Sequence, residues 1–393
     1  MLDRARRFPV RILVLGCPLC CSGPISGDAA KTASSSALLL NAPGGIGGRV
    51  RSCTVTRPTL ITASWSAIAR SSLLALLLLS SFLSGPVWAK DADPAQPPSG
   101  PWFTGTLLST RGSSVDQGHL VVEPYFYVTR FGSLYNNNWR LQSATTSTTY
   151  VQQVYFIYGL TSRIDLEFAP QWLGNYSRHE SFTGFGDFPL QLGFQVLRSP
   201  ADSWLPDVRI WAQETFPTGS YDQLSPTTTG LSGTGGGSYA TTLGIGIQKA
   251  IGLTGDHVLR YRLNASYGFY SPVNVREFNS YGGGFGTAGR VNPGSVTTLT
   301  VAGEYTLTRH MVLALDVSFQ IADATRFSGT SGIGMTGDPA TVGKGYSEVL
   351  TFAPAVEYNW NQHVGVIAGP WFSLRGRNTS EFFGVVMALY LYM

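Results

Sequence analysis

The feature that most constrains the fold is a two-residue periodicity that returns in stretches of about ten residues beyond Gln117. In "RIDLEFAPQW", apolar side chains from Ile164 to Trp172 take alternate positions, and Asp165 and Glu167 lie between them. Successive side chains of a β-strand point to opposite faces, so this pattern indicates a strand with one apolar and one polar environment. The chain is therefore predicted to be all-β.

Twelve stretches carry the pattern, and bacterial single-chain membrane barrels have an even number of strands. They lie at 118–131, 149–159, 162–174, 185–198, 206–217, 238–250, 257–270, 296–307, 310–322, 347–359, 362–374 and 380–392. The links after the even-numbered stretches are short. Those after the first, third, fifth, seventh and ninth are long and rich in Gly, Ser, Thr and Asn. This alternation predicts an up-and-down antiparallel transmembrane β-barrel with short periplasmic turns, long outer loops and both termini in the periplasm.

The charged positions indicate which face of each strand looks inward. In "VLRYRLNASYGFY", Arg260 and Arg262 oppose Leu259, Tyr261 and Leu263. An arginine that faces lipid near the midplane costs about 2–4 kcal/mol, so the polar set is predicted to face the lumen. By the same parity the lumen-facing charged candidates are Glu123, Asp165, Glu167, Asp187, Arg209, Arg260, Arg262, Glu304, Asp316 and Glu357.

These inward charges have two interpretations. Acidic and basic groups on opposing walls would set a transverse field that selects solutes, as charged rings do in channels. Alternatively, they pair with one another and plug the lumen, which is narrow in a twelve-stranded barrel. The sequence does not say which strands face each other, so both interpretations stay open.

A soluble β-sandwich also has alternating strands, but water on its polar face would favour many Lys and Glu side chains. Here Lys is scarce and each strand has one or two charges, which favours the membrane barrel. Aromatic residues near strand ends, such as Trp172 and Trp360, are typical of girdles at the membrane interfaces, although β-rich proteins in general use aromatic residues.

The most apolar run, Leu73 to Leu83, is shorter than the roughly 20 residues of a spanning helix. Its flanks are those of a secretory signal peptide at 70–89, cleaved after Ala89. Residues 1–69 are then a misassigned-start extension or a disordered segment. The protein is expected in the outer membrane of a Gram-negative-type bacterium.

Two segments follow the expected cleavage site. Residues 90–117 are predicted to be a periplasmic tether, because "DADPAQPPSGP" has a disordered composition. Residues 118–393 form the barrel.

The exported part has no Cys, because Cys17, Cys20, Cys21 and Cys53 all precede the cut. A disulfide framework and a Cys-ligated metal are therefore excluded. Nine of the 27 Lys and Arg and two of the 23 Asp and Glu also precede it, so the exported part is slightly acidic and nucleic acid is not an expected partner.

No catalytic, cofactor or metal site is predicted. The histidines at 119, 257, 310 and 363 are scattered and lack metal-ligand spacing. His179-Glu180-Ser181 is the only His-x-Ser, and no third group that would orient the histidine is evident. "GTGGGS" at Gly233 lacks the Lys-Ser/Thr of a phosphate loop, and is predicted to be a mobile outer loop.

Three stretches resemble the family of outer-membrane proteins labelled for the meta-pathway of phenol degradation. They are "GFGDFPLQLGFQVL" from Gly184, "ETFPTGSYD" from Glu214 with the Gly-rich run that follows, and "GPWFSLRGRNTSEFFGVVMALYLYM" from Gly369. The resemblance spans roughly Gly118 to Met393. It implies a porin-like barrel that passes small, often apolar or aromatic compounds, and it does not imply an enzyme.

The sequence thus predicts an outer-membrane channel for passive or facilitated diffusion of small molecules. The alternatives are a structural or adhesive outer-membrane barrel and, less favoured, a lipid hydrolase. The expected partners are outer-membrane lipid, a small-molecule solute and the barrel-assembly machinery, because the last strand resembles the signal that this machinery recognises. Met393 replaces the terminal Phe of that signal. The solute and the oligomeric state stay open.

Overall fold

The computed structural model describes residues 101–178, 180–200, 203–228 and 230–393. The predicted signal peptide, the extension at 1–69 and the first part of the predicted tether lie outside the described residues. None of the described residues forms a helix long and apolar enough to cross a membrane.

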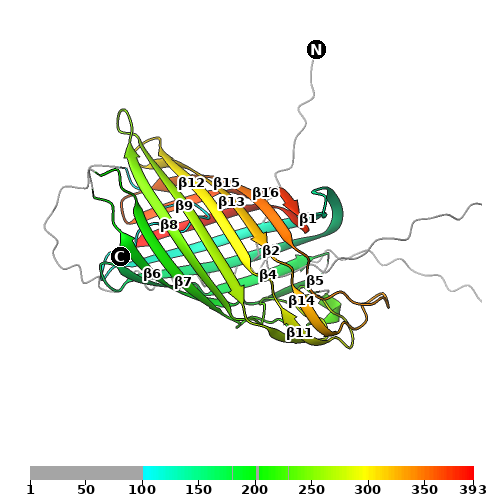
Figure 1. The fold of residues 1–393 in the computed structure, drawn as a ribbon. Coiled ribbons are helices and arrows are strands. Elements are labelled where there is room, and N and C mark those ends of the chain that lie inside the picture. Colours follow the sequence, from blue (N-terminus) through cyan, green and yellow to red (C-terminus); the bar gives the residue numbers. More distant parts are fainter. Residues whose placement is uncertain (1–100, 179, 201–202, 229) are drawn as a thin grey trace, which may run out of the picture. The chain divides into compact units, whose positions relative to one another are not determined.

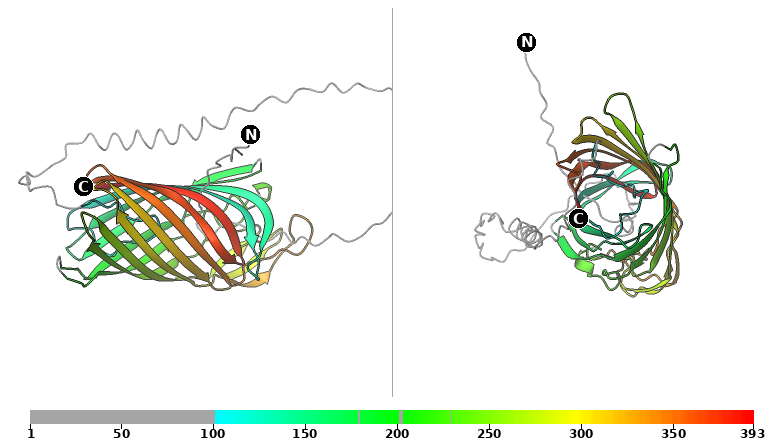
Figure 2. Two further views of the ribbon diagram at one scale, coloured as in Figure 1. Left: turned by 90° about the horizontal axis from the view of Figure 1, so that it is seen from above. Right: turned by 90° about the vertical axis from the view of Figure 1, so that its left-hand side faces the viewer.

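One antiparallel sheet closes on itself to form the barrel (Figures 1 and 2). β1 (Leu120–Tyr135) closes the ring because it pairs with both β2 (Leu141–Gly159) and β17 (Thr379–Tyr392). Between β2 and β17, the ring runs through β3 (Ile164–Phe168) with β4 (Gln171–Ser177), β5 (Glu180–Phe185) with β6 (Phe188–Leu197), β7 (Asp207–Phe216), β8 (Ala240–Gly252), β9 (Val258–Tyr270), β12 (Val296–Thr306), β13 (Met311–Ala322), β15 (Ser347–Asn359) and β16 (Val364–Arg377).

The prediction of twelve antiparallel strands is confirmed, because β3 with β4 and β5 with β6 each serve as one barrel strand. Pro170 lies in the first interruption, and Pro189 is the second residue of β6, directly after the second; neither has a backbone N–H for the ladder. Their carbonyls still bond across the break. Val154 donates its N–H to Pro170 at 3.1 Å, and Ala169 donates to Pro189 at 3.3 Å.

Two outer links that were predicted to be long loops are hairpins. β1 and β2 extend beyond the ring to a turn at Asn136–Arg140, and β4 and β5 extend to a turn at Arg178. The Ser and Thr side chains of 143–149 are polar on both faces, which hides the strand period, although β-branched Thr favours strands. The last link is tighter still, with Asn378 alone in the left-handed region at φ 49°.

A second sheet lies at the outer end of the barrel and was not predicted. It consists of β10 (Val273–Arg276), β11 (Ala288–Asn292) and β14 (Arg326–Thr330), which pair antiparallel (Figure 1). The side chains of Val275 and Val291 are buried in it. Its strands have only four or five residues each, too few to show a period within Gly-rich segments.

The outer face of the barrel wall is apolar, whereas the inner face has polar side chains beside an apolar cluster that includes Ile367 and Val386. On β6, the outward Leu192 is 51% exposed, whereas the inward Gln195 is 2% exposed. A soluble sandwich would bury the leucine and expose the amide, so this distribution excludes that alternative. It matches a barrel whose outer surface contacts hydrocarbon.

We predict that Val301→Arg destabilises the barrel by about 2–4 kcal/mol, because Val301 points outward from the middle of β12 and would place a charge in hydrocarbon. Urea unfolding after refolding into phospholipid vesicles measures this loss. Leu141→Arg is the matched control, since both residues are 58% exposed but Leu141 lies in the outer hairpin. Equal losses from the two variants would contradict the assigned membrane belt.

Candidate functional site

Residues 102–116 lie against the inner wall of the barrel, so the predicted periplasmic tether is wrong for this part of 90–117. Residues 102–116, here called the collar, cross the inner faces of β15, β13, β9, β8, β6 and β3 in that order. Thr104 donates its N–H to the Glu357 carboxylate at 2.8 Å, and Ser109 donates to Asp316 at 3.0 Å. The collar therefore follows about half of the inner wall.

Inward side chains of the wall form hydrogen bonds with both the N–H groups and the carbonyl groups of the collar backbone. Gln195 accepts the Ser114 N–H at 2.5 Å, and Asn264 donates to the Thr110 carbonyl at 3.0 Å. Buried backbone groups need such partners, and the collar forms no strand that could supply them. Gly112 permits the close approach to β8, because a Cβ there would lie 2.5 Å from the Cβ of Gln248.

Nine of the ten predicted lumen charges lie at one level of the barrel. Each is within six residues of the periplasmic end of its strand, and this group consists of Glu123, Asp165, Glu167, Arg209, Arg260, Arg262, Glu304, Asp316 and Glu357. The inward positions nearer the outer end of the described strands have uncharged side chains, among them Thr149, Thr300 and Thr351. The charges thus form a ring at the level of the collar.

Charged groups in this ring have specific partners. Arg209 pairs with Asp165 through two hydrogen bonds, one of 3.1 Å from Nε, and both side chains are fully buried. Glu304 takes a 2.6 Å bond from Arg260 Nε and lies 3.5 Å from Arg262 Nε. The inward charges were predicted either to set a field across the lumen or to pair with one another. These contacts are the ones that pairing predicts.

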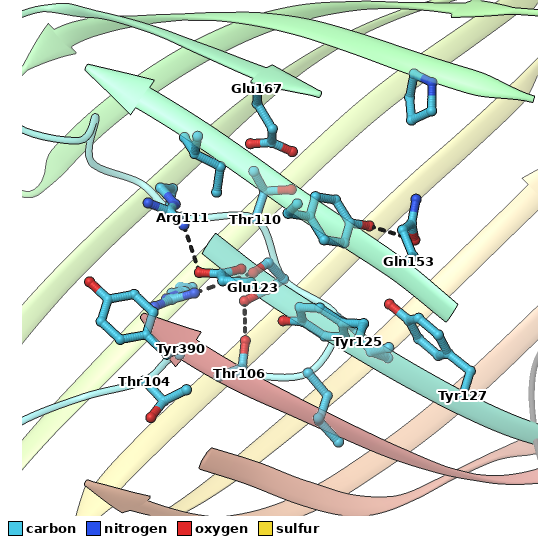
Figure 3. A pocket seen from close by; sticks show the side chains of 18 of the residues that line it. Thr104, Thr106, Thr110, Arg111, Glu123, Tyr125, Tyr127, Gln153, Glu167 and Tyr390 are labelled. Carbon is cyan, nitrogen blue, oxygen red and sulfur yellow. Dashed lines mark hydrogen bonds and ion pairs between the residues drawn. The ribbon is translucent and has the colours of Figure 1, made fainter. Parts of the chain in front are cut away.

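Asp316 and Glu357 have a role that the sequence analysis did not consider, because both accept backbone N–H groups of the collar. Asp165 does so as well, in addition to its ion pair, since Val115 donates to it at 3.3 Å. The collar in turn completes the ring, because its Arg111 donates to Glu123 at 2.8 Å (Figure 3). The acidic wall residues and the N-terminal segment therefore stabilise each other.

Asp187 is the tenth predicted charge and lies apart from the ring, between β5 and β6. Its carboxylate accepts the N–H of Gly219 at 3.0 Å and of Gly236 at 2.8 Å, which belong to the two limbs of the loop at 217–239. Asn175 on the inner wall donates to the Leu231 carbonyl of the same loop at 2.8 Å. The loop, which was predicted to be mobile, is thus anchored over the outer mouth.

A cavity of about 470 Å³ remains between the collar and the wall formed by β1, β2 and β17 (Figure 3). Tyrosines dominate that wall, and the rings of Tyr125 and Tyr127 stack with centroids 5.6 Å apart at 18°. Tyr155 and Tyr390 also line the cavity. In a ring of twelve strands β9 lies opposite β1, so Arg260 and Arg262 face the wall of β1, β2 and β17, here called the tyrosine wall.

The sequence contained a signal for these tyrosines. Once Glu123 is assigned to the inner face, Tyr125 and Tyr127 share its parity. They were not predicted because only charged side chains identify the lumen face directly, by the cost of a charge in lipid.

His119, His257, His310 and His363 each lie beside the periplasmic end of a strand. Within the described ranges, no three His, Cys, Asp or Glu side chains are grouped to hold a metal ion. His257 and His310 stack on Tyr305 and Tyr358 at the periplasmic strand ends, 5.4 and 6.1 Å between centroids. His179 lies outside the described residues.

No protein-family model and no curated protein matches the chain. The COG4313 outer membrane channel of Pseudomonas putida F1 has a similar structure, with a TM-score of 0.53 and 14% identity over 77% of this chain and 100% of that one. Weaker similarities are to the NanC porin, with a TM-score of 0.35 and 9% identity over 69% and 98%, and to a TodX monoaromatic hydrocarbon channel variant, with 0.30 and 11% over 71% and 91%. The chain has the fold of an outer-membrane barrel.

We predict that Arg209→Met lowers the free energy of unfolding by about 3–5 kcal/mol, because it leaves Asp165 buried without its counter-ion. Urea unfolding in vesicles measures this loss. Adding Asp165→Asn should recover most of it, since the variant then buries no unpaired charge. Arg198→Met, which breaks an exposed pair with Asp116, is the control and should cost less than about 1 kcal/mol. A loss at Arg209 no larger than at Arg198 would contradict the buried pair.

For Asp187→Ala we predict faster hydrogen exchange in the loop at 217–239, because both limbs lose their shared acceptor. Mass spectrometry of loop peptides gives the rate, and a tenfold increase is expected. Asp222→Ala is the control within the same loop, since the ion pair of Asp222 is a 3.7 Å contact with the exposed Arg276. Unchanged exchange in Asp187→Ala would show that the loop is held by other contacts.

Proposed function

We propose that the protein is an outer-membrane channel for passive or facilitated diffusion of small molecules. The observation that carries this proposal is the 470 Å³ cavity beside the collar, inside a barrel whose outer face is apolar. A barrel with only a structural role could fill its interior with side chains, as small barrels do. Here the collar narrows the lumen and leaves a passage along the tyrosine wall.

The environment of the channel follows from its surface. Outer-membrane lipid contacts the apolar belt, and export by the predicted signal peptide at 70–89 would deliver the chain to the periplasm. The barrel-assembly machinery would recognise β17, whose outward Phe383 and Met387 are exposed to lipid. Membership of the phenol meta-pathway family is part of the proposal and rests on the motifs from Gly184, Glu214 and Gly369.

Neither alternative has a comparable observation in its favour. An adhesive barrel would use its outer loops, and the loop at 217–239 is instead directed onto the inner wall at Asn175. A lipid hydrolase would need an oriented nucleophile. Ser181 lies on β5 without a side-chain hydrogen bond to a carboxylate among the described residues.

We predict that deleting residues 102–113 raises the single-channel conductance of the exported chain several-fold, because the collar narrows the lumen. Planar-bilayer recordings in KCl measure it, and the retained heat-dependent gel shift of a folded barrel shows that the variant is folded. Water would then hydrate Asp316 and Glu357, whose acceptor sites the collar occupies.

A variant that lacks residues 91–99, upstream of the collar, is the matched control and should conduct like the intact chain. Silent bilayers for both the intact chain and the collar deletion would refute the channel. Equal steady currents would refute the collar as the constriction.

A further inference from the structure

We infer that the cavity between the collar and the wall of β1, β2 and β17 is a binding site for an uncharged, hydroxylated ring compound. The inference rests on the proposed channel function and adds the class of solute that the passage selects. The cavity has a flat aromatic wall, unused hydrogen-bonding groups and charged side chains that are already paired.

The aromatic wall offers surfaces that fit a ring. Tyr125 stacks on Tyr127, and Tyr155 meets Tyr125 edge-on with centroids 5.3 Å apart at 72°. Trp371 and Tyr390 continue the same wall from β16 and β17. Flat apolar faces of sugar or benzene rings pack on such surfaces, where aromatic side chains supply contact area and little flexibility.

Several polar atoms around the cavity have unused hydrogen-bonding capacity. The buried indole N–H of Trp371 has no partner among the described residues. Gln153 accepts from the Tyr155 hydroxyl at 3.0 Å, and none of the described groups bonds its amide nitrogen. Gln171 and Gln213 both donate their amide N–H, and no described donor reaches their side-chain oxygens.

The cavity therefore presents at least two donors and two acceptors. A hydroxyl group both donates and accepts, so a compound with several hydroxyls can satisfy both kinds of group. A volume of about 470 Å³ falls within the range of small-molecule sites and fits one small ring compound with its substituents.

The arginine side chains that line the cavity already have partners within the protein, which disfavours binding of an ionic solute. Arg111 is paired with Glu123. Arg260 is paired with Glu304 and lies 4.2 Å over the ring of Phe103, and Arg262 donates to the Ser109 carbonyl. An ion that entered would lose hydration without gaining a free counter-charge.

Glu167 is the exception, because it accepts an amide N–H from Gln191 and has no guanidinium within 4 Å among the described residues. Arg111 and Arg209 nevertheless interact electrostatically with it, which offsets its attraction for a cation. A cationic solute is therefore one outcome that the experiment has to separate.

The test uses the exported chain with its collar in planar bilayers, where a bound solute interrupts the ionic current. Inositol and hydroquinone are the neutral probes, one alicyclic and one aromatic. 4-Hydroxybenzoate and glucosamine are the anionic and cationic probes. Saturable interruptions by at least one neutral probe, at least tenfold more frequent than those by either ion, are expected, and the neutral probe that acts identifies the ring type.

Gln153→Leu should reduce the interruptions by the active neutral probe at least tenfold, because it removes the free amide. Gln320→Leu is the matched control, since Gln320 is inward on β13 but does not line the cavity, and it should leave both current and interruptions unchanged. Equal or stronger interruption by an ion, or no effect of Gln153→Leu, would overturn the site. A steady current that no neutral probe interrupts overturns the site alone, whereas silence in KCl overturns the channel as well.

Discussion

Every backbone N–H and C=O in the hydrocarbon of a membrane needs a partner within the protein, and this constraint governs the structure. Strands satisfy it only when the sheet has no free edge. The pairing of β1 with β17 meets it and encloses an interior that hydrocarbon cannot reach. Polar and charged side chains can therefore occupy alternate positions of all the strands without contact with lipid.

The same closure makes the interior a confined space in which charges need partners. Arg209 finds Asp165 on a neighbouring part of the wall, but Asp316 and Glu357 are not paired with any guanidinium among the described salt bridges. The backbone of the collar supplies their hydrogen bonds, because the N–H of Thr104 donates to Glu357 and the N–H of Ser109 donates to Asp316. Leu107 and Val115 of the collar also pack into buried apolar clusters of the wall, so hydrogen bonds and apolar contacts together hold the segment in place. The cavity that it leaves lies on the side of the barrel where tyrosines line the wall.

The local sequence pattern was sufficient to predict the strands. Each strand has one face toward lipid and one toward the lumen, and this difference produces the two-residue period. Parity places Leu192 outside and Arg209 inside, as the burial of both residues shows. The hairpin extensions and the sheet of β10, β11 and β14 were missed because water contacts both their faces or their strands are very short. In the hairpin extension no single face is selected, so the period fades, whereas the four residues of β10 alternate over too short a length to be recognised.

The site depends on contacts that no local pattern encodes. Thr104 and Glu357 are 253 residues apart in the chain, and the composition around Thr104, rich in Gly, Ser and Thr, is that of a linker as well as of a collar. Asp187 shares the inward parity of the ring, yet the break between β5 and β6 directs it to the loop at 217–239. Parity therefore predicts the face of a residue but not its partner.

Hydrogen exchange of the peptide at 101–117, in protein folded in a bilayer, tests the central claim that this segment is fixed against the inner wall. The account predicts that amides of Thr104, Ser109 and Ser114 exchange orders of magnitude more slowly than in a free peptide, because each donates to a buried acceptor. Exchange at the free-peptide rate would contradict it and would return the segment to the role of a tether.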